Sequence, residues 1–449
     1  MPTILSEQPK KVPNLTPLNP PTQNTNGGFN NLKNPFKKGY GPKMFGEMSK
    51  STSVTPTPIK IPVPGEGLPR VIHYCADQSG CAFWRLIWPA DELLAHNKAV
   101  VMTLYQMVAD GHFYGGIDAI RLQRQCTDMQ VGFIKFLRKV SDDMKKQTGK
   151  GFRLIWEVDD VILPASDIPD YNICKTAFTE DTIHKNVLEA MKYVDEMSVP
   201  SEYMRQHYQK HLNFDKISVI PNYAPKNWID RGYDKDKVMD IYRKHKSKPR
   251  VLYAGSGTHF DVSNKVNQQD DFAGVVDMIA DDIMNKQKYE WVFLGAIPLK
   301  LRQFIGRGIE FHPWCAITDY PDTIKKLNVN ISIAPLQDNA FSRSKANIKL
   351  TEAGMQGIPC VAQNIACYNY DGWKYLFNNS TEMFEHIDNI LSDESTYENA
   401  VDTVRKYAEE YILQDHLDEL VLLYTTPFGD SKRKENVHFL RNNPTQFNS

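Results

Sequence analysis

The sequence lacks any apolar run close to the ~20 residues that a membrane-spanning helix needs. Its first residues also lack the apolar core of a signal peptide. Cysteine is sparse: the 449 residues include seven cysteines and no C-x-x-C pair, which fits a reducing compartment better than a disulfide framework. We therefore expect no transmembrane segment and a cytoplasmic location, which is the host cytoplasm if the source is a virus.

An excess of charge of one sign is lacking as well, since the formal net charge is −1. This balance gives the chain as a whole no reason to bind nucleic acid. It hides an asymmetry, because residues 1–64 carry eight lysines against Glu7 and Glu47, a net charge of +6. The segment also holds twelve of the 27 prolines and too few aliphatic residues to offset its ordering entropy. We predict a disordered basic arm at 1–67, acting as a linker, a docking tail or a phosphate-tracking segment.

Strand-like apolar runs alternate with helical patterns over the rest of the chain, which predicts α/β domains with doubly wound, largely parallel sheets. The first series of strands lies at 71–75, 100–104, 117–122, 153–158, 196–199 and 216–220. The second series lies at 250–254, 291–294, 309–311, 329–334 and 358–362. We predict an N-terminal Rossmann-like domain at 68–221, a linker at 222–249, a C-terminal Rossmann-like domain at 250–425 and a tail at 426–449.

Polar residues gather inside one strand–helix–strand unit of the second series. After the strand at 329–334, a helical pattern at about 344–355 carries Lys345, Lys349 and Glu352. A helix N-terminus favours phosphate, and the two lysines are one turn apart, so both could lie on one face. Cations for a diphosphate and a carboxylate for sugar hydroxyls describe a nucleotide-sugar site. The alternative is an ordinary unit of this kind with exposed lysines.

A short glycine-containing loop follows the first strand of the second series. Gly255 allows close approach of the backbone, and Ser256 and Thr258 offer hydroxyl groups to phosphate. This pattern indicates a phosphate-binding loop. A tight turn with a helix cap is the alternative explanation.

Two groups of polar residues follow strands of the first series. Ser79, Gly80 and Arg85 come after the first strand, and Arg85 is either an anion contact or a structural ion-pair partner. Glu157, Asp159 and Asp160 end the strand at 153–158. Burying like charges together is costly without a cation or a catalytic need. We therefore predict that Asp159 or Asp160 is a carboxylate of the acceptor site or a general base, with helix capping as the alternative.

The unit around Glu352 resembles the nucleotide-binding half of GT-B glycosyltransferases, particularly the large retaining family that includes many bacterial mannosyl- and glucosyltransferases. The order of Gln123-Arg124-Gln125, the acidic strand end at 157–160 and Val219-Ile220-Pro221-Asn222 is similar to a bacterial and bacteriophage subgroup. Many members carry another glutamate eight residues before the one that matches Glu352, where this chain has Ser344.

The resemblance implies two Rossmann-like domains that face a cleft and a hexosyl- or pentosyltransferase that uses a UDP-, GDP- or ADP-linked sugar. Glu352 would hold the ribose hydroxyls, and Lys345 and Lys349 would stabilise the diphosphate as its charge develops. Ser79, Gly80, Arg85 and Glu157 would lie on the acceptor side. Retention at the anomeric carbon is implied as well. No metal ligand and no covalently bound cofactor is expected.

The acceptor has two interpretations. A hydroxymethylated base of bacteriophage DNA is favoured by the basic arm and by a basic helical face with Lys135, Arg138 and Lys139. A surface glycan, a lipid-linked sugar or a protein is the other. A hypothesis from another class is a non-catalytic binding or assembly protein, which Ser344 favours.

Overall fold

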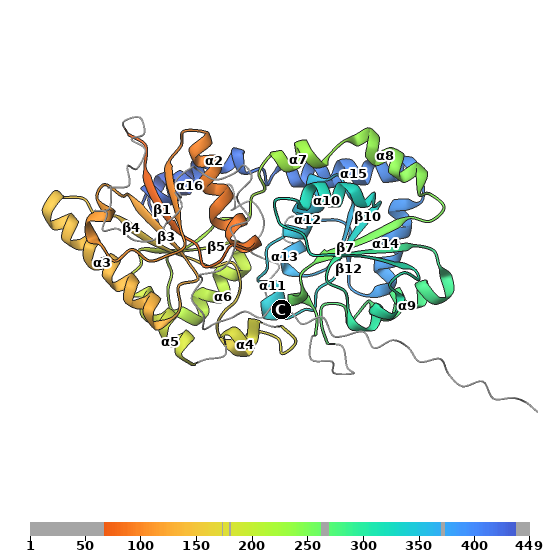
Figure 1. The fold of residues 1–449 in the computed structure, drawn as a ribbon, viewed down its shortest axis with the longest axis horizontal. Coiled ribbons are helices and arrows are strands. Elements are labelled where there is room, and N and C mark those ends of the chain that lie inside the picture. The colour runs from red at the N-terminus through yellow and green to blue at the C-terminus, as the bar shows by residue number, and fades with distance from the viewer. Residues whose placement is uncertain (1–66, 173, 179–180, 262–268, 370–372, 437–449) are drawn as a thin grey trace, which may run out of the picture. The chain divides into compact units, whose positions relative to one another are not determined.

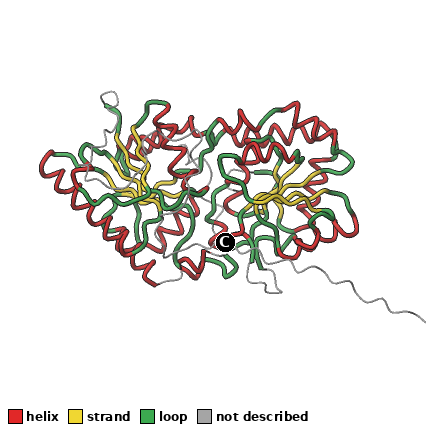
Figure 2. The backbone as a smooth tube through the Cα atoms, in the orientation of Figure 1, coloured by secondary structure: helices red, strands yellow, loops and turns green. Residues whose placement is uncertain are grey.

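The structure is a computed structural model that describes residues 67–172, 174–178, 181–261, 269–369 and 373–436 (Figure 1). The predicted arm lies outside these ranges except for its last residue. Two parallel six-stranded sheets with helices around them make up the described part, so the predicted α/β class with two doubly wound Rossmann-like units is confirmed. Figure 2 shows the strands gathered in two groups with helices outside them.

The first sheet has the strand order β2-β1-β3-β4-β5-β6, and every neighbouring pair is parallel. Its strands are β1 (Arg70–Tyr74), β2 (Val100–Leu104), β3 (Ala119–Gln123), β4 (Arg153–Glu157), β5 (Glu196–Val199) and β6 (Ile217–Val219). The chain order reverses at β1, so loops after β1 and β3 run to opposite faces, which is where open sheets of this kind bind ligands.

The helices of the first half connect these strands. They are α1 (Gly80–Ala82), a π-helical turn (Phe83–Ile87), α2 (Trp88–Ala95), α3 (Asp128–Thr148), α4 (Cys174–Phe178), α5 (Asp181–Met191) and α6 (Glu202–Leu212). Helix α3 begins at a capping box, in which Thr127 and Gln130 bond each other's backbone, and ends at Gly149 with φ 80°. Short 3-10 turns lie at Gly111–Tyr114 and Ala165–Asp167.

The second sheet has the strand order β12-β11-β10-β7-β8-β9 and is also parallel throughout. Its strands are β7 (Arg250–Gly255), β8 (Glu290–Gly295), β9 (Ile309–Pro313), β10 (Ile331–Ala334), β11 (Cys360–Gln363) and β12 (Leu376–Phe377). The order reverses between β7 and β10, so the carboxyl ends of these two strands flank the crevice of this sheet.

The remaining described helices follow the first sheet in the chain. They are α7 (Asn227–Gly232), α8 (Lys235–Lys244), α9 (Val276–Asp281), α10 (Tyr320–Leu327), α11 (Ala340–Arg343), α12 (Ile348–Met355), α13 (Ala366–Asn369), α14 (Ser380–Leu391), α15 (Glu394–Glu409), α16 (Leu417–Thr425) and α17 (Ser431–Asn436). A π-helical turn lies at Asp282–Lys286, and 3-10 turns lie at Gly257–His259, Leu299–Phe304 and Leu413–His416.

The helix predicted at 344–355 covers only residues 348–355 in the structure, and a separate short helix precedes it. Helix α11 ends at Arg343, and α12 begins at Ile348. Asn347 does not cap α12, because its side chain donates a 2.6 Å hydrogen bond to the Tyr407 hydroxyl of α15. Lys345 therefore lies in a turn, and the prediction that it shares a helical face with Lys349 is wrong.

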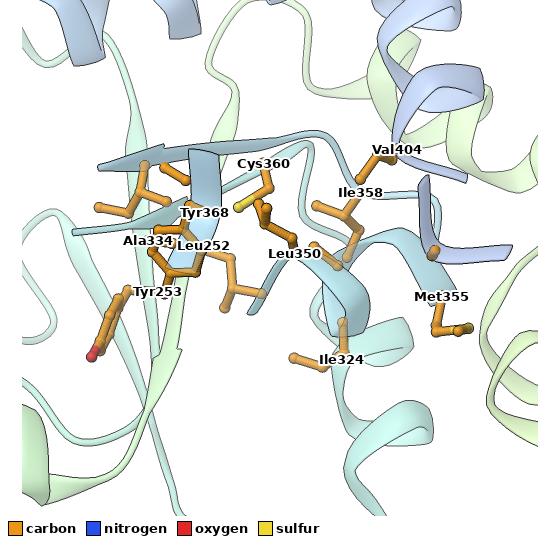
Figure 3. Close-up of a cluster of buried hydrophobic side chains, with 14 of the residues drawn as sticks. Leu252, Tyr253, Ile324, Ala334, Leu350, Met355, Ile358, Cys360, Tyr368 and Val404 are labelled. Atoms are coloured by element: carbon orange, nitrogen blue, oxygen red, sulfur yellow. The ribbon is translucent and has the colours of Figure 1, made fainter. Parts of the chain in front are cut away.

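Helix α12 is held tightly in the core of the second half. Figure 3 shows Leu350 and Ile358 in one cluster with Leu252 and Cys360 of the sheet, and these four side chains are buried. A Cβ atom on Gly354 would lie 2.4 Å from the carbonyl oxygen of Val404, so only glycine allows α15 to approach so closely. The position of Lys349 and Glu352, which are carried by α12, is set by this packing.

The last described residues contact the first sheet. The Tyr424 hydroxyl of α16 lies 2.9 Å from His73 Nε2 of β1, and Arg153 of β4 donates to the Thr426 carbonyl at 2.8 Å. Arg433 of α17 donates to both carboxylate oxygens of Glu196 at 2.6 Å, and both side chains are buried. Helix α16, drawn blue in Figure 1, lies among orange elements of the first half and contacts α2 and β3.

Candidate functional site

The carboxyl end of β7 runs into the predicted phosphate-binding loop. Ser256 caps the turn Gly257–His259, and its hydroxyl lies 2.6 Å from that of Thr258. A Cβ atom on Gly255 would lie 2.5 Å from the Tyr253 hydroxyl, so the β7 end has no room for a larger residue. The cap and the tight turn are therefore a structural reason for Gly255 and Ser256. The hydroxyls of Ser256 and Thr258 are also half-buried at the strand end, where a phosphate could reach them.

Lys349 and Glu352 are two charged residues of α12 that lie near this loop. The Lys349 ammonium donates to the carbonyl oxygen of Ala254 and lies 4.9 Å from the centre of the Tyr253 ring. Glu352 accepts a 3.1 Å hydrogen bond from the Tyr320 hydroxyl of α10. Both side chains line a small pocket, open to solvent, between α10, α12 and β10.

The surroundings of this pair shift both pKa values towards the neutral forms. Burial raises the pKa of Glu352 to about 7, against the opposing effects of Lys349 and the Tyr320 hydrogen bond. Burial is also the largest cause that lowers the pKa of Lys349, with the Lys345 charge acting in the same direction. A hydroxyl-rich or anionic ligand would supply the hydrogen bonds that the two groups lack.

Lys345 does not line the same cavity. Its ammonium lies 4.7 Å from the centre of the Phe341 ring, and it lines a separate cavity of about 580 Å³ with Ser201, Tyr203 and Asn347. Its charge lowers the pKa of His259 in the β7 loop and of Asp160 after β4. Lys345 has no ion pair within the described ranges, so its ammonium is left for an anion.

Ser344 is enclosed. Its hydroxyl donates to the Ala340 carbonyl at 2.8 Å, its own carbonyl accepts from Ser201 at 3.0 Å, and the residue is 0% exposed. Ser344 therefore offers nothing to a bound sugar in this structure. Any contact to the transferred sugar has to come from another residue.

Arg85 and Glu157, expected on the acceptor side, bond each other instead. Arg85 Nε donates to Glu157 Oε1 at 2.6 Å, and Arg121 Nε donates to Oε2 at 2.9 Å. The Ser198 hydroxyl also donates to Glu157. Glu157 is 0% exposed and Arg85 is 2% exposed, so the structural ion pair left open above accounts for both.

Ser79 and Gly80 lie at the start of α1. The Ser79 amide and hydroxyl both bond Asp77 Oδ1, at 2.8 and 2.7 Å. No atom lies within 4 Å of where a Gly80 Cβ would be, so the backbone there is open. Asp77 also pairs with Arg124, which brings this loop next to the acidic loop after β4.

Asp159 and Asp160 follow β4 in a loop and are half-buried. Arg124 Nε lies 3.7 Å from Asp159 Oδ1, and this buried oxygen has no hydrogen-bond partner among the described residues. Burial and the neighbouring Asp159 charge raise the pKa of Asp160 to about 6, against the opposing charge of Lys345. A carboxylate with such a pKa can exchange a proton near neutral pH.

Sequence reasoning missed a buried group beside the β7 loop. Asp271 accepts from His259 at 2.7 Å, from the Tyr171 hydroxyl at 2.7 Å and from the Gln337 amide at 3.0 Å. Burial lowers the pKa of His259 to about 4, so its imidazole is neutral at pH 7. Asp271 has no motif of its own, and only its contacts with three distant segments reveal it.

Two groups of side chains in the described residues have the composition of a metal site. Cys81, Asp159 and Asp160 form one, and Asp167, His207 and His211 form the other, with one donor atom from each residue within 4.8 Å of the others in its group. His207 and His211 are four residues apart on α6, a spacing that sequence reasoning overlooked. That spacing is readable from the sequence, whereas the approach of Asp167 is not.

Comparisons with family models and with curated protein sequences find no match. Solved structures do match. HepE from Anabaena, in complex with UDP and glucose, is 12% identical over 79% of this chain and 98% of its own, with a TM-score of 0.51. The likeness therefore covers nearly the whole of that protein. The chain has the GT-B fold.

Two further GT-B structures give the same result. Sucrose-phosphate synthase from Thermosynechococcus elongatus is 11% identical over 80% of this chain and 98% of its own, with a TM-score of 0.53. A glycosyltransferase from Rickettsia africae is 12% identical over 84% of this chain and 100% of its own, with a TM-score of 0.50. The GT-B fold predicted above is thus shared over nearly the whole length of these proteins.

No helix in the described ranges combines the length and the apolar character that crossing a bilayer requires. All seven cysteines lie in these ranges, and each is a free thiol.

Proposed function

We propose that this protein transfers a sugar from a nucleotide-diphosphate donor to a hydroxyl group of an acceptor. The observation that carries the proposal is the Lys349–Glu352 pair on α12, half-buried beside the end of β7 with pKa values shifted towards neutrality. HepE was solved with UDP and glucose, which makes a UDP-linked sugar the first donor to try. GDP- and ADP-linked donors remain within the proposal.

On the donor side, Glu352 would accept hydrogen bonds from the ribose hydroxyls. The bond from Tyr320 reaches one carboxylate oxygen, Oε2, so lone pairs are left for a ligand. The hydroxyls of Ser256 and Thr258 and the ammonium of Lys345 would bind the diphosphate. Lys349 would stabilise the negative charge that grows on the diphosphate as the bond to the sugar breaks.

On the acceptor side, Asp160 is the candidate base, because its raised pKa lets it take a proton from a hydroxyl near neutral pH. Burial is the main cause of this raised pKa, and the neighbouring Asp159 charge raises it further. The resemblance implies retention at the anomeric carbon, and we keep retention as part of the proposal. Domain closure would exclude water and limit hydrolysis of the donor.

A glycan, a lipid-linked sugar or a protein is the acceptor that we favour. The basic helix that suggested DNA is largely neutralised, since Lys135 pairs with Glu189 at 2.7 Å and Arg138 pairs with Asp195 at 2.6 Å. Arg121 and Arg153 are likewise bound to buried glutamates. A hydroxymethylated DNA base then depends mainly on the arm, and a bacteriophage source depends on the arm and on the subgroup resemblance given above. The free thiols agree with a reducing, cytoplasmic location.

The test is a screen of UDP-, GDP- and ADP-sugars by thermal shift, followed by mass spectrometry of donor breakdown and of candidate acceptors. We expect stabilisation by one nucleotide class and slow donor hydrolysis without acceptor. Glu352→Gln should remove most of the stabilisation. Glu394→Gln is the matched control, because Glu394 is 48% exposed and pairs only with Arg243 among the described residues. Binding without turnover of any donor would favour the non-catalytic alternative.

A further inference from the structure

The group formed by Asp167, His207 and His211 lies outside the candidate site. His207 and His211 occupy successive turns of α6, and Asp167 ends the 3-10 turn after the acidic loop. Asp167 Oδ2 lies 3.8 Å from His207 Nδ1 and 3.7 Å from His211 Nε2. One oxygen therefore faces two imidazole nitrogens at nearly equal distances, both too long for a hydrogen bond.

The proton on His207 can be placed from its other contact. His207 Nε2 lies 2.9 Å from the carbonyl oxygen of Leu163, and a carbonyl only accepts, so Nε2 carries the hydrogen. In the neutral ring, Nδ1 then carries a lone pair and lies 3.8 Å from a carboxylate oxygen. This backbone bond on the far nitrogen is the arrangement that orients histidine ligands in metal sites.

The carboxylate of Asp167 is oriented as well. Its Oδ1 accepts a 3.1 Å hydrogen bond from the Ser166 hydroxyl, which leaves Oδ2 towards the two rings. His207 is 8% exposed, so lone pairs of a nitrogen and an oxygen face each other away from most of the solvent. Such an arrangement is unfavourable unless a cation or a proton lies between them.

A second histidine–carboxylate contact in the chain serves as an internal comparison. His259 Nδ1 lies 2.7 Å from Asp271 Oδ2, which is an ordinary charge-assisted hydrogen bond. The Asp167 distances are about 1 Å longer. They are closer to the ~3.3 Å that separates ligand atoms placed tetrahedrally at about 2.0–2.1 Å from a zinc ion.

We propose that Asp167, His207 and His211 form a binding site for a first-row transition metal ion of the zinc type. Two imidazoles and a carboxylate are borderline ligands that suit Zn²⁺ and exclude a preference for Mg²⁺, which takes oxygen ligands. The fourth position is left to water.

The ion would join two segments that are distant in sequence. Asp167 follows the loop with Asp159 and Asp160, and α6 begins at Glu202, next to the cavity that Lys345 lines. A metal bridge would therefore hold the acidic loop against α6. The role is structural and does not depend on the proposed transfer of a sugar.

The experiment uses the full-length chain without an affinity tag. The protein is treated with a chelator, freed of it by gel filtration, incubated with Zn²⁺ or Mg²⁺ and desalted, and bound metal is measured by mass spectrometry. We expect about one zinc ion per chain, a higher Tm with zinc and no change with magnesium. Absence of retained zinc in the wild-type protein would overturn the proposal.

The variants His211→Gln and Asp167→Asn locate the ion. Their side chains are 24% and 27% exposed, so both proteins are expected to fold, which circular dichroism checks. Bound zinc should fall to less than about a tenth of the wild-type amount in each. His96→Gln is the matched control, because His96 also lies near a carboxylate, 3.4 Å from Glu92, but has no second histidine beside it.

Cobalt(II) provides an independent readout. Ions bound by two histidines and an aspartate give weak visible bands without the strong near-ultraviolet absorption of a thiolate ligand. Thiolate absorption, or zinc retention unchanged in His211→Gln, would assign the ion to Cys81 or another of the free thiols and overturn the proposal.

Discussion

A buried charged group of the first half and a half-buried charged pair of the second half differ in how many hydrogen bonds they make. In the first half, Glu157 is 0% exposed and accepts from Arg85, Arg121 and Ser198, so both carboxylate oxygens are satisfied. In the second half, Glu352 has one hydroxyl partner and Lys349 has one carbonyl partner. Burial shifts the pKa values of both groups of this second pair towards their neutral forms.

This difference offers a criterion to distinguish a structural ion pair from a charged group that is a candidate for binding a ligand. A carboxylate with every lone pair occupied by rigid donors has nothing left to bind. A carboxylate with unfilled acceptor positions beside a cavity carries a desolvation cost that a ligand can relieve. Incomplete hydrogen bonding, more than burial alone, is our reason to propose the Lys349–Glu352 pair as part of a donor site.

The largest expected effect comes from Glu157→Ala. Removal of the carboxylate leaves two buried guanidinium groups without their partner, which costs about 3–5 kcal/mol of the free energy of unfolding. Urea unfolding followed by circular dichroism measures it. Glu394→Ala, at an exposed pair, should cost less than about 1 kcal/mol. Equal losses in the two variants would break the comparison.

Lys349→Ala tests the other half. Because the ammonium would act on charge that develops during the reaction, we expect turnover to fall about hundredfold with a smaller change in donor affinity. Steady-state kinetics with the donor identified by the screen separates kcat from KM. Lys300→Ala is the control, since Lys300 is 51% exposed and pairs with Asp277. An increase in KM alone would contradict the assigned role.

Glu352→Gln should leave the fold intact and weaken donor binding about tenfold or more. A carboxylate that accepts from ribose hydroxyls contributes roughly 1.5–3 kcal/mol, which the neutral amide does not match. Calorimetric titration of the nucleoside diphosphate measures the loss. Donor affinity equal to that of the wild type would remove Glu352 from the site and leave its raised pKa without a function.

The smallest effect is on pH dependence. With a pKa of about 6, Asp160 is ionised above that pH, so turnover should rise as pH increases through about 6 and level off above it. Lys345→Ala should move this limb to higher pH, because the lysine charge lowers the Asp160 pKa. Asp160→Asn should remove the limb. A rate that does not vary between pH 5 and 7 would exclude Asp160 as the base.

The same shift has a consequence for stability, with the opposite sign. The folded state holds a proton on Asp160 up to about pH 6, whereas the unfolded chain releases it near 3.8. The Asp160 contribution to stability therefore decreases as pH rises from about 4 to about 6. Asp160→Asn should flatten the unfolding free energy over that window.

The strands were predictable because buried parallel strands are short apolar runs between polar turns. The strands expected at 100–104 and 196–199 match β2 and β5 to the residue. The start of the helix predicted at 344–355 was not predictable. The spacing of Lys345 and Lys349 suits a helix, and no local residue pattern indicates that α12 begins only at Ile348. This later start accompanies a hydrogen bond from Asn347 to Tyr407, 60 residues away.

The site was predictable only in part, for a similar reason. Residue types at the ends of β7 and β10 indicated where a ligand would bind, and Lys349 and Glu352 do line one cavity there. The pairing of Arg85 with Glu157 and the approach of Asp271 to His259 depend on how separate segments pack. Single-sequence patterns carry no information on such contacts.

The return of α16 and α17 to the first sheet has a consequence for biosynthesis. The first six strands are complete at Val219, but the partners of His73 and Glu196 lie at Tyr424 and Arg433. At about 5–20 residues per second, roughly 200 further residues delay those partners by about 10 to 40 s. During translation the six strands of the first sheet are therefore available before Tyr424 and Arg433 are made, and His73 and Glu196 lack these two partners until then.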